Sequence, residues 1–165
     1  MLESMGLVFA LTGMAIAVFL SGIGSSIGLG VASKSATAVL SEKPERYGIL
    51  MLLVVLPSTQ GIYGFVVGLF VMIKLNIFAG FDAVYAVTWA QGLQIMAACL
   101  PVAIAGMISA IHQGKTGAAG IMMAAKRPEL AFKAGVVFAA MVELYAILGF
   151  LISLLTLMLG IKVGA

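Results

Sequence analysis

One carboxylate, Glu143, interrupts a long apolar stretch near the end of the chain. The apolar residues on either side extend far enough to place it near the middle of a lipid bilayer. An ionised carboxylate at that depth costs at least about 2.5–3.5 kcal/mol, so it needs a cation, a proton or strong hydrogen-bond donors. Because ionisable groups inside a membrane mark ion pathways, we predict that Glu143 binds a translocated cation. The alternative is a protonated structural Glu that bridges helices.

Polar side chains from two other parts of the chain are expected at the same depth. Gln113 lies about as far before the Lys-Arg pair at 126–127 as Glu143 lies after it. Antiparallel helices rise by about 1.5 Å per residue and therefore bring such positions level. Thr59 and Gln60 lie equally far past the preceding polar turn. Taken singly, each of these residues is also explained as an interhelical hydrogen bond.

The segment around Thr59 adds further oxygen atoms. Thr59, Gln60 and Tyr63 are spaced to share one helix face. Pro57 has no N–H, so the carbonyl of Leu53 loses its helical partner and a kink is expected at 53–57. A carboxylate, a hydroxyl, two amide oxygens and a carbonyl suit a hard monovalent cation, not a transition metal. The neutral oxygens favour Na⁺ over H⁺, although a proton site can keep them as partners of a protonated Glu.

Four long apolar helices are needed to position these groups. The chain has 165 residues, of which 63% are hydrophobic and 9% charged, and its mean hydropathy is +1.22. A soluble domain cannot bury so much apolar surface. Polar breaks leave spans at about 7–40, 48–75, 83–125 and 130–161, and the short, proline-containing first and third breaks predict antiparallel hairpins. The predicted fold is an all-α membrane protein with four transmembrane helices.

Basic residues gather on the side of the two hairpin turns. Seven of the nine Lys and Arg residues lie there, and two lie opposite. By the positive-inside rule, the turns face the cytoplasm and both termini lie outside. The net charge of +3 is therefore a topology signal, and it predicts no nucleic-acid partner.

The two hairpins resemble copies of each other. When position 44 is aligned with position 128, an offset of 84, the Pro-Glu pairs of the two turns coincide and Thr59 falls on Glu143. The chain therefore divides into residues 1–80, a hairpin without a carboxylate, and residues 81–165, a hairpin that carries Glu143. One ion site is expected where two ancestral hairpins would have carried two.

Small residues recur at every fourth position in the first and third spans. Such stripes let helix backbones approach closely in lipid. Their presence in both spans favours the inner layer of a ring of identical subunits, with a contact inside a single bundle as the alternative. The predicted ring-packing residues are Gly22, Ser26, Gly30, Gly106, Ala110 and Gly114.

Four segments carry a family resemblance that runs along the whole chain. They are residues 19–25 (FLSGIGS), 56–65 (LPSTQGIYGF), 113–115 (QGK) and 139–150 (AAMVELYAILGF). These segments resemble the duplicated proteolipid, or K subunit, of prokaryotic V-type rotary ATPases in its sodium-transporting form. The resemblance implies a ring that rotates against a stator membrane subunit and is joined to a central-stalk subunit. Ion flow would be coupled to ATP hydrolysis or synthesis in a peripheral head, and the chain would be no enzyme by itself.

The resemblance also implies a ligand set and a mechanism. The implied Na⁺ ligands are Glu143, Gln113, Gln60, Thr59 and the carbonyl of Leu56, with Tyr63 donating to the carboxylate. The stretch between Gln113 and Glu143 is one residue longer than the resemblance implies, around residues 132–135. Bound Na⁺ would neutralise Glu143 and let the subunit turn through lipid, until a stator arginine displaces the ion.

Other functions remain open at this stage. An H⁺-translocating ring would differ in its cargo alone. A small secondary transporter or pore-forming oligomer would bind an organic cation in an aqueous cavity lined by aromatic residues, where this sequence offers small side chains and oxygen ligands. An intramembrane hydrolase would need a second catalytic group level with Glu143, and the sequence shows none. His112 faces another side of its helix from Gln113 and is expected to be a satisfied polar residue, not a ligand.

Overall fold

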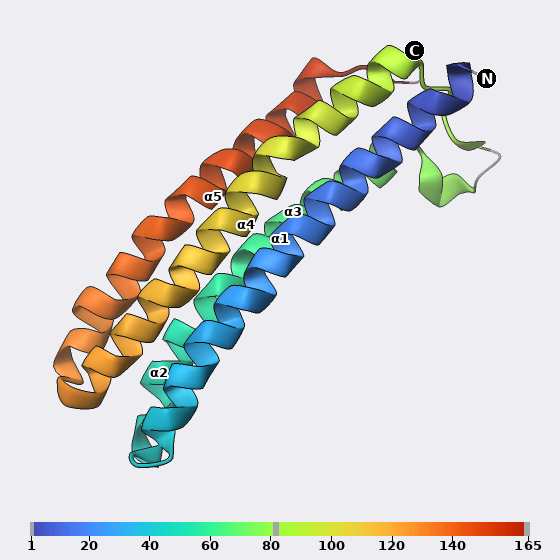
Figure 1. Ribbon diagram of the computed structural model, residues 1–165. Coiled ribbons are helices and arrows are strands. Elements are labelled where there is room, and N and C mark those ends of the chain that lie inside the picture. Colours follow the sequence, from blue (N-terminus) through green and yellow to red (C-terminus); the bar gives the residue numbers. More distant parts are fainter. Residues whose placement is uncertain (1, 81–82, 164–165) are drawn as a thin grey trace.

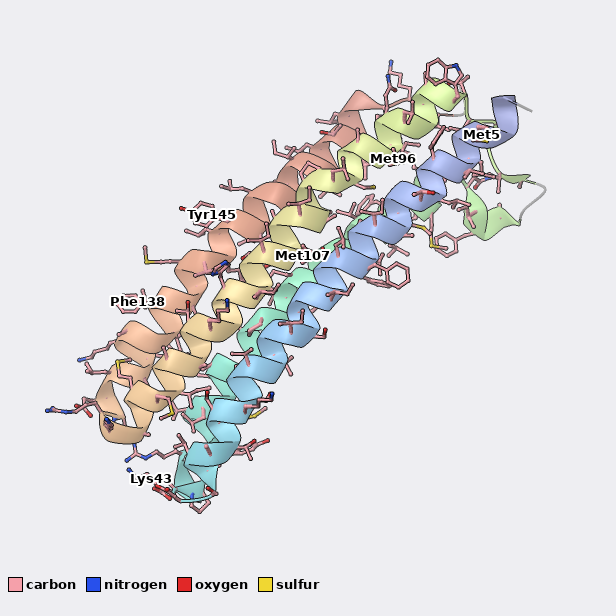
Figure 2. All side chains as sticks on the ribbon, in the orientation of Figure 1. Met5, Lys43, Met96, Met107, Phe138 and Tyr145 are labelled. Atoms are coloured by element: carbon pink, nitrogen blue, oxygen red, sulfur yellow. The ribbon has the colours of Figure 1, made fainter. Side chains whose placement is uncertain are left out.

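Four helical spans lie side by side in an elongated molecule, as the computed structural model shows (Figure 1). The structure describes the backbone of residues 2–80 and 83–163, and side chains from residue 5 onward within these ranges. The spans Met5–Leu40, Pro44–Lys74, Trp89–Lys126 and Ala131–Gly160 are long and apolar enough to cross a membrane. Large side chains such as Phe138 and Tyr145 point away from the helices (Figure 2). The predicted all-α fold with four transmembrane helices is confirmed.

The spans form two antiparallel hairpins. Both hairpin turns lie at one end of the molecule, and the two ends of the chain lie at the other (Figure 1). The expected border between residues 1–80 and 81–165 adjoins residues 81–82, which lie outside the described residues. That division therefore stays a prediction.

The second span is broken where the sequence predicts a kink. The first span is the single helix α1 (Leu2–Leu40). The second consists of η1 (Pro44–Arg46), α2 (Tyr47–Val55), η2 (Leu56–Ser58) and α3 (Thr59–Lys74). Pro57 lies in η2, a 3₁₀ turn, because proline removes the donor that an α-helix would need there. This turn brings the next residue, Thr59, to the start of α3.

The third span begins later than predicted. The sequence places its start at residue 83, whereas α4 runs from Trp89 to Lys126. Thr88 is its N-cap: the Thr88 hydroxyl accepts the N–H of Gln91 at 3.3 Å, and the Gln91 side chain accepts the N–H of Thr88 at 3.0 Å. This capping box fixes the helix start. Residues 84–88, which precede α4, have no helical structure. Further back along the chain, the 3₁₀ turn η3 (Ile77–Ala79) follows the end of the second span.

The fourth span contains π-helical turns. It consists of η5 (Ala131–Val136), α5 (Val137–Leu155) and η6 (Thr156–Gly160), of which η5 and η6 are π-helical. A π-helical bond closes over one more residue than an α-helical bond. Segment η5 covers residues 132–135, where the chain is one residue longer than the family resemblance implies. The extra residue is taken up there, ahead of Glu143.

This extra residue also shifts the internal repeat. A Cβ added to Gly64 of α3 would meet Ser21 of α1, and a Cβ added to Gly149 of α5 would meet Ala105 of α4. The two contacts occupy corresponding places in the two hairpins. However, Ser21 and Ala105 are 84 positions apart, whereas Gly64 and Gly149 are 85 positions apart. The offset is therefore 84 between α1 and α4 and 85 between α3 and α5.

The prediction that Thr59 coincides with Glu143 is consequently wrong by one position. With the offset of 85, the counterpart of Glu143 is Ser58. The physical reason is the π-helical turn, which spacing in the sequence does not reveal. A neutral hydroxyl still stands where the second carboxylate would be, so one carboxylate for two hairpins remains the expectation.

The most extensive contact in the molecule joins α1 to α4. A Cβ added to Gly24 would lie 2.5 Å from the Cα of Met107, and one added to Gly114 would collide with the backbone of Gly28. No side chain fits between the helices at these points, so their backbones touch, as small residues allow in membrane helices. Helices α3 and α5 pack outside this pair, α3 against α1 and α5 against α4.

The two predicted small-residue stripes have different surroundings. Gly106, Ala110 and Gly114 are buried, and α1 of the same chain covers them. Gly22 and Gly30 of α1 have open space where a Cβ would be, and Ser26 is exposed. The α4 stripe thus packs within the chain, which was the alternative interpretation, and the α1 stripe is free to pack elsewhere. Ring packing stays a prediction.

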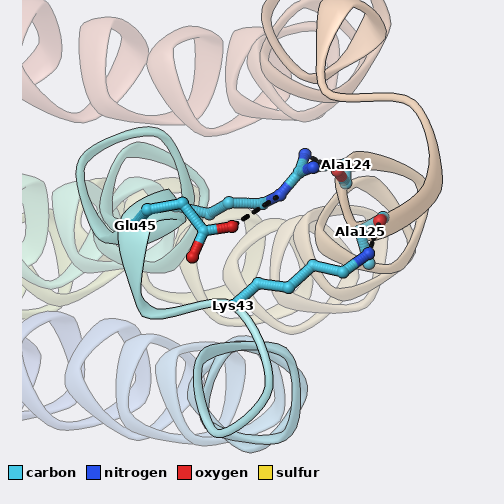
Figure 3. Close-up of polar contacts among 5 residues, drawn as sticks. Lys43, Glu45, Ala124 and Ala125 are labelled. Atoms are coloured by element: carbon cyan, nitrogen blue, oxygen red, sulfur yellow. Dashed lines mark hydrogen bonds and ion pairs between the residues drawn. The ribbon is translucent and has the colours of Figure 1, made fainter.

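Two basic side chains of the first turn join the hairpins at their turn ends (Figure 3). Lys43 Nζ donates to the carbonyl of Ala125 at 2.7 Å, and Arg46 Nη1 donates to the carbonyl of Ala124 at 2.7 Å. These carbonyls belong to the last turn of α4, where an isolated helix leaves acceptors without partners. The positive charges also stabilise the negative end of the helix dipole.

Gly114→Ala is expected to lower the melting temperature of the detergent-purified protein, because the added methyl group must separate α1 from α4. Overpacking of this kind costs about 1–3 kcal/mol. Gly48→Ala is the matched control, since a Cβ at Gly48 meets nothing within 4 Å and alanine favours a helix. Equal melting temperatures for the two variants would contradict the described α1–α4 contact.

Candidate ion-binding site

Glu143 lies on α5 and receives hydrogen bonds from two other helices. The hydroxyl of Tyr63 on α3 donates to Oε1 at 2.8 Å, and Nε2 of Gln113 on α4 lies 3.3 Å from Oε2. The same Nε2 donates to the carbonyl of Ala139, one turn before Glu143, at 3.0 Å. Both carboxylate oxygens are therefore held, and Gln113 is in register with Glu143.

The hydrogen bonds continue from Gln113 to the second span. Nε2 of Gln60 donates to Oε1 of Gln113 at 2.8 Å, and both side chains are fully buried. The hydroxyl of Thr59 lies 3.3 Å from Oε1 of Gln60 and donates to the carbonyl of Leu56 at 2.9 Å. The structure thus brings all six predicted residues into one connected set. This site network consists of Leu56, Thr59, Gln60, Tyr63, Gln113 and Glu143.

The 3₁₀ turn η2 decides which carbonyl joins the site network. The carbonyl of Leu56 accepts both the N–H and the hydroxyl of Thr59. The carbonyl of Leu53, whose α-helical partner Pro57 removes, lies against α4 instead: a Cβ added to Gly117 would be 2.8 Å from it. Leu53 therefore does not contribute the freed oxygen expected from the proline, and Leu56 lies at the site.

Three supporting residues were not predicted as part of the site. Phe150 stacks on Tyr63 with ring centroids 5.1 Å apart, which holds the phenol next to Glu143. Ser109 donates to the carbonyl of Val142 at 2.8 Å. Ser25 accepts the N–H of Gly61 at 2.8 Å.

The sequence did carry signals for these three. Phe150 lies two helical turns after Glu143 and so shares its face. Ser25 and Ser109 coincide at the offset of 84 that relates α1 to α4. Each serine bonds to the backbone of the helix that follows its own in the same hairpin, near the middle of the span.

No basic side chain balances Glu143 in the described part of the chain. The ion pairs found there, Glu45 with Arg46 at 3.9 Å and Glu129 with Arg127 at 3.7 Å, belong to the two turns. Within residues 2–80 and 83–163, no three His, Cys, Asp or Glu residues come together as metal ligands. The arrangement is one carboxylate among neutral oxygens and amides, which matches a singly charged hard cation.

The chain matches the family model of the ATP synthase C subunit, over residues 12–71 and 96–156. It is 48% identical over 150 residues to the V-type sodium ATPase subunit K of Enterococcus hirae, covering 91% of this chain and 90% of that protein. It is 34% identical over 158 residues to the A-type ATP synthase subunit K of Methanocaldococcus jannaschii, covering 96% of this chain and 65% of that protein. The two matched segments start at positions 84 apart and finish at positions 85 apart, as the extra residue of the second hairpin requires.

Gln60→Leu and Gln113→Leu are each expected to destabilise the protein, because each leaves the other buried amide without its partner. The double variant should lose less stability than the sum of the two, with a coupling of about 0.6–1.7 kcal/mol, the range found for hydrogen bonds between membrane helices. Thermal unfolding in detergent of the unchanged protein, the two single variants and the double variant gives this coupling energy. Strictly additive losses would contradict the Gln60–Gln113 bond.

Proposed function

Since the chain belongs to the ATP synthase C subunit family, we propose that it is a rotor-ring subunit of a V-type ATPase that carries Na⁺ through the membrane on Glu143. The similarity to a V-type sodium ATPase subunit K supports the choice of complex and of ion. The observation that carries the proposal is the site network: one unbalanced carboxylate, with neutral oxygen groups from α3, α4 and η2 arranged around it.

The composition of the site network favours Na⁺ over H⁺. A proton requires one carboxylate oxygen, and the remaining groups would then serve as hydrogen-bond partners. A dehydrated Na⁺ needs several oxygens in place of its water shell. The hydroxyl of Thr59 and the carbonyl of Leu56 are such oxygens, and a rotation of an amide by about 180° presents the oxygen of Gln60 or Gln113 instead of its NH₂.

Charge neutralisation explains how binding is coupled to rotation. An ionised Glu143 facing lipid is unfavourable by at least about 2.5–3.5 kcal/mol, whereas the ion-bound carboxylate is neutral overall. A subunit therefore leaves the stator only when loaded. A stator arginine would release the ion by pairing with the bare carboxylate. The ring would be joined to a central stalk and, through it, to a peripheral head that makes or hydrolyses ATP, while this chain performs no catalysis itself.

We place the two turns on the cytoplasmic side and the chain ends outside. The support is the concentration of Lys and Arg at the turns, including Lys43, Arg46, Lys126 and Arg127. The central stalk would then meet the ring at this end. The alternative of a transporter with an aqueous, aromatic-lined cavity has less support, because Tyr63 and Phe150 at the site stack on each other.

Carbodiimide labelling of Glu143 in the purified membrane protein tests the ion. Na⁺ is expected to slow labelling, and K⁺ at the same ionic strength is not, because bound Na⁺ keeps the carboxylate from being protonated and attacked. Labelling that Na⁺ does not slow would contradict the sodium assignment and favour the proton alternative.

Thr59→Val is expected to raise the half-protecting Na⁺ concentration about tenfold, which corresponds to roughly 1.4 kcal/mol for one lost oxygen ligand. Ser58→Ala is the matched control, because the neighbouring hydroxyl donates to the carbonyl of Val55 at 2.6 Å and lies outside the site network. If Thr59→Val leaves the half-protecting Na⁺ concentration unchanged, or if both variants change it equally, Thr59 is not a ligand of the ion.

A further inference from the structure

An aromatic stack borders the site network on the side of the chain ends. The ring of Phe150 on α5 lies against the ring of Tyr63 on α3, with centroids 5.1 Å apart and planes inclined by 27°. Tyr63 is therefore fixed at two points, since its hydroxyl also donates to Glu143 at 2.8 Å. Both aromatic side chains are half-buried. Because the space around Tyr63 is open on one side, the stack opposes a turn of the phenol away from Glu143.

The internal repeat shows that this stack belongs to the ion site. At the offset of 85 between α3 and α5, Phe150 corresponds to Phe65, and Leu148 corresponds to Tyr63. Phe65 is 57% exposed and stacks on no aromatic ring in the described part of the chain. The repeat thus supplies a phenylalanine in each hairpin, and the one beside the carboxylate has an aromatic partner.

Helix α5 is fixed to α4 on both sides of Phe150. One residue earlier, a Cβ added to Gly149 would lie 2.8 Å from the carbonyl oxygen of Pro101, so the two helices touch there. Three residues later, Oγ of Ser153 accepts the N–H of Val102 at 3.0 Å. These two contacts set the position of α5 along α4, and with it the position of the Phe150 ring.

The hydrogen bond to Val102 extends to a third helix. A proline inside a helix clashes with the carbonyl four residues earlier and disturbs the helical bonds around it, and Val102 directly follows Pro101. Ser153 supplies an acceptor for the N–H of Val102, and Ser21 of α1 donates to its carbonyl at 3.1 Å. Both serines are fully buried. We call Ser21, Val102 and Ser153 the Val102 junction.

The first hairpin makes the corresponding contact without a hydrogen bond. Val102 and Ser153 correspond to Val18 and Gly68 at the offsets of 84 and 85. A Cβ added to Gly68 would lie 2.7 Å from Cγ2 of Val18, so this contact is apolar and Gly68 has no side chain to donate or accept. The hydrogen-bonded form of the contact, like the aromatic stack, occurs in the hairpin that carries the carboxylate.

We infer that Phe150 is a positioning residue of the ion site: held in place by the Val102 junction, it keeps the Tyr63 hydroxyl on Glu143 and so slows the exchange of bound Na⁺. For the ion to leave, the carboxylate must turn away from its other ligands, and this requires the bond from Tyr63 to break. Phe150 contributes no oxygen to the ion and acts through Tyr63. This inference rests on the proposed Na⁺ site and adds that residues about two helical turns beyond Glu143 set how long the ion stays.

Release of radioactive Na⁺ from the purified full-length protein into excess unlabelled Na⁺ tests this role. Phe150→Leu is expected to speed release about fivefold, an effect of the size that the loss of one aromatic pair produces. Phe150→Tyr keeps a ring for stacking and is expected to release as slowly as the unchanged protein. Phe65→Leu, the same substitution at the counterpart position, is the matched control and should leave the rate unchanged. Ser153→Ala should speed release, because it removes the acceptor that holds α5 to α4.

A second measurement separates positioning from a general loss of structure. In a Tyr63→Phe background the hydroxyl is already gone, so Phe150→Leu is expected to change the release rate no further. A purely structural effect would be the same in both backgrounds.

Three results would overturn the role of Phe150 and leave the proposed Na⁺ site standing. They are an unchanged release rate in Phe150→Leu, an equal effect of Phe65→Leu, and a full effect of Phe150→Leu in the Tyr63→Phe background. An unchanged rate in Ser153→Ala would overturn the part assigned to the Val102 junction. An unchanged protein that retains no Na⁺ would instead overturn the proposed function, and this inference with it.

Discussion

The cost of an ionised carboxylate inside an apolar span is the constraint on which the rest of this structure depends. Glu143 is the one charged residue between positions 134 and 161 of the sequence. Tyr63 and Gln113 hold both of its oxygens from two other helices, and this requires α3, α4 and α5 to meet at one depth. Neutral donors reduce the cost of the charge but do not cancel it, so the site needs a cation or a proton.

Features of the backbone around the site allow α3, α4 and α5 to come together there. Glycines let the backbones of α1 and α4 touch, and α3 and α5 pack on the outside of this helix pair. The 3₁₀ turn at Pro57 brings the carbonyl of Leu56 toward Thr59. The π-helical turn η5 takes up one residue and sets the register of Glu143 against Gln113. Each of these local departures from the α-helix occurs in a span that contributes to the site.

The sequence predicts the site network well because polar residues in apolar spans are few and costly, so their depth alone brings Gln60, Gln113 and Glu143 together. The prediction from sequence fails where a local hydrogen-bond pattern determines where a helix begins or which residues of the two hairpins correspond. The capping box at Thr88 moves the start of α4, and η5 makes Ser58, not Thr59, the counterpart of Glu143. The sequence also does not reveal how α1 is rotated about its axis. Spacing identifies the stripe of small residues that contains Gly22, but the structure shows that Gly24 and Gly28, on another side of α1, contact α4.

The central claim is that the one carboxylate of the two hairpins makes one ion site per chain. Equilibrium binding of radioactive Na⁺ to the purified protein, with Glu143→Gln alongside, measures this directly. Close to one Na⁺ per chain is expected for the unchanged protein and none for Glu143→Gln, in which the amide keeps the shape of the side chain but removes its charge. Two ions per chain, or binding that survives Glu143→Gln, would contradict the account.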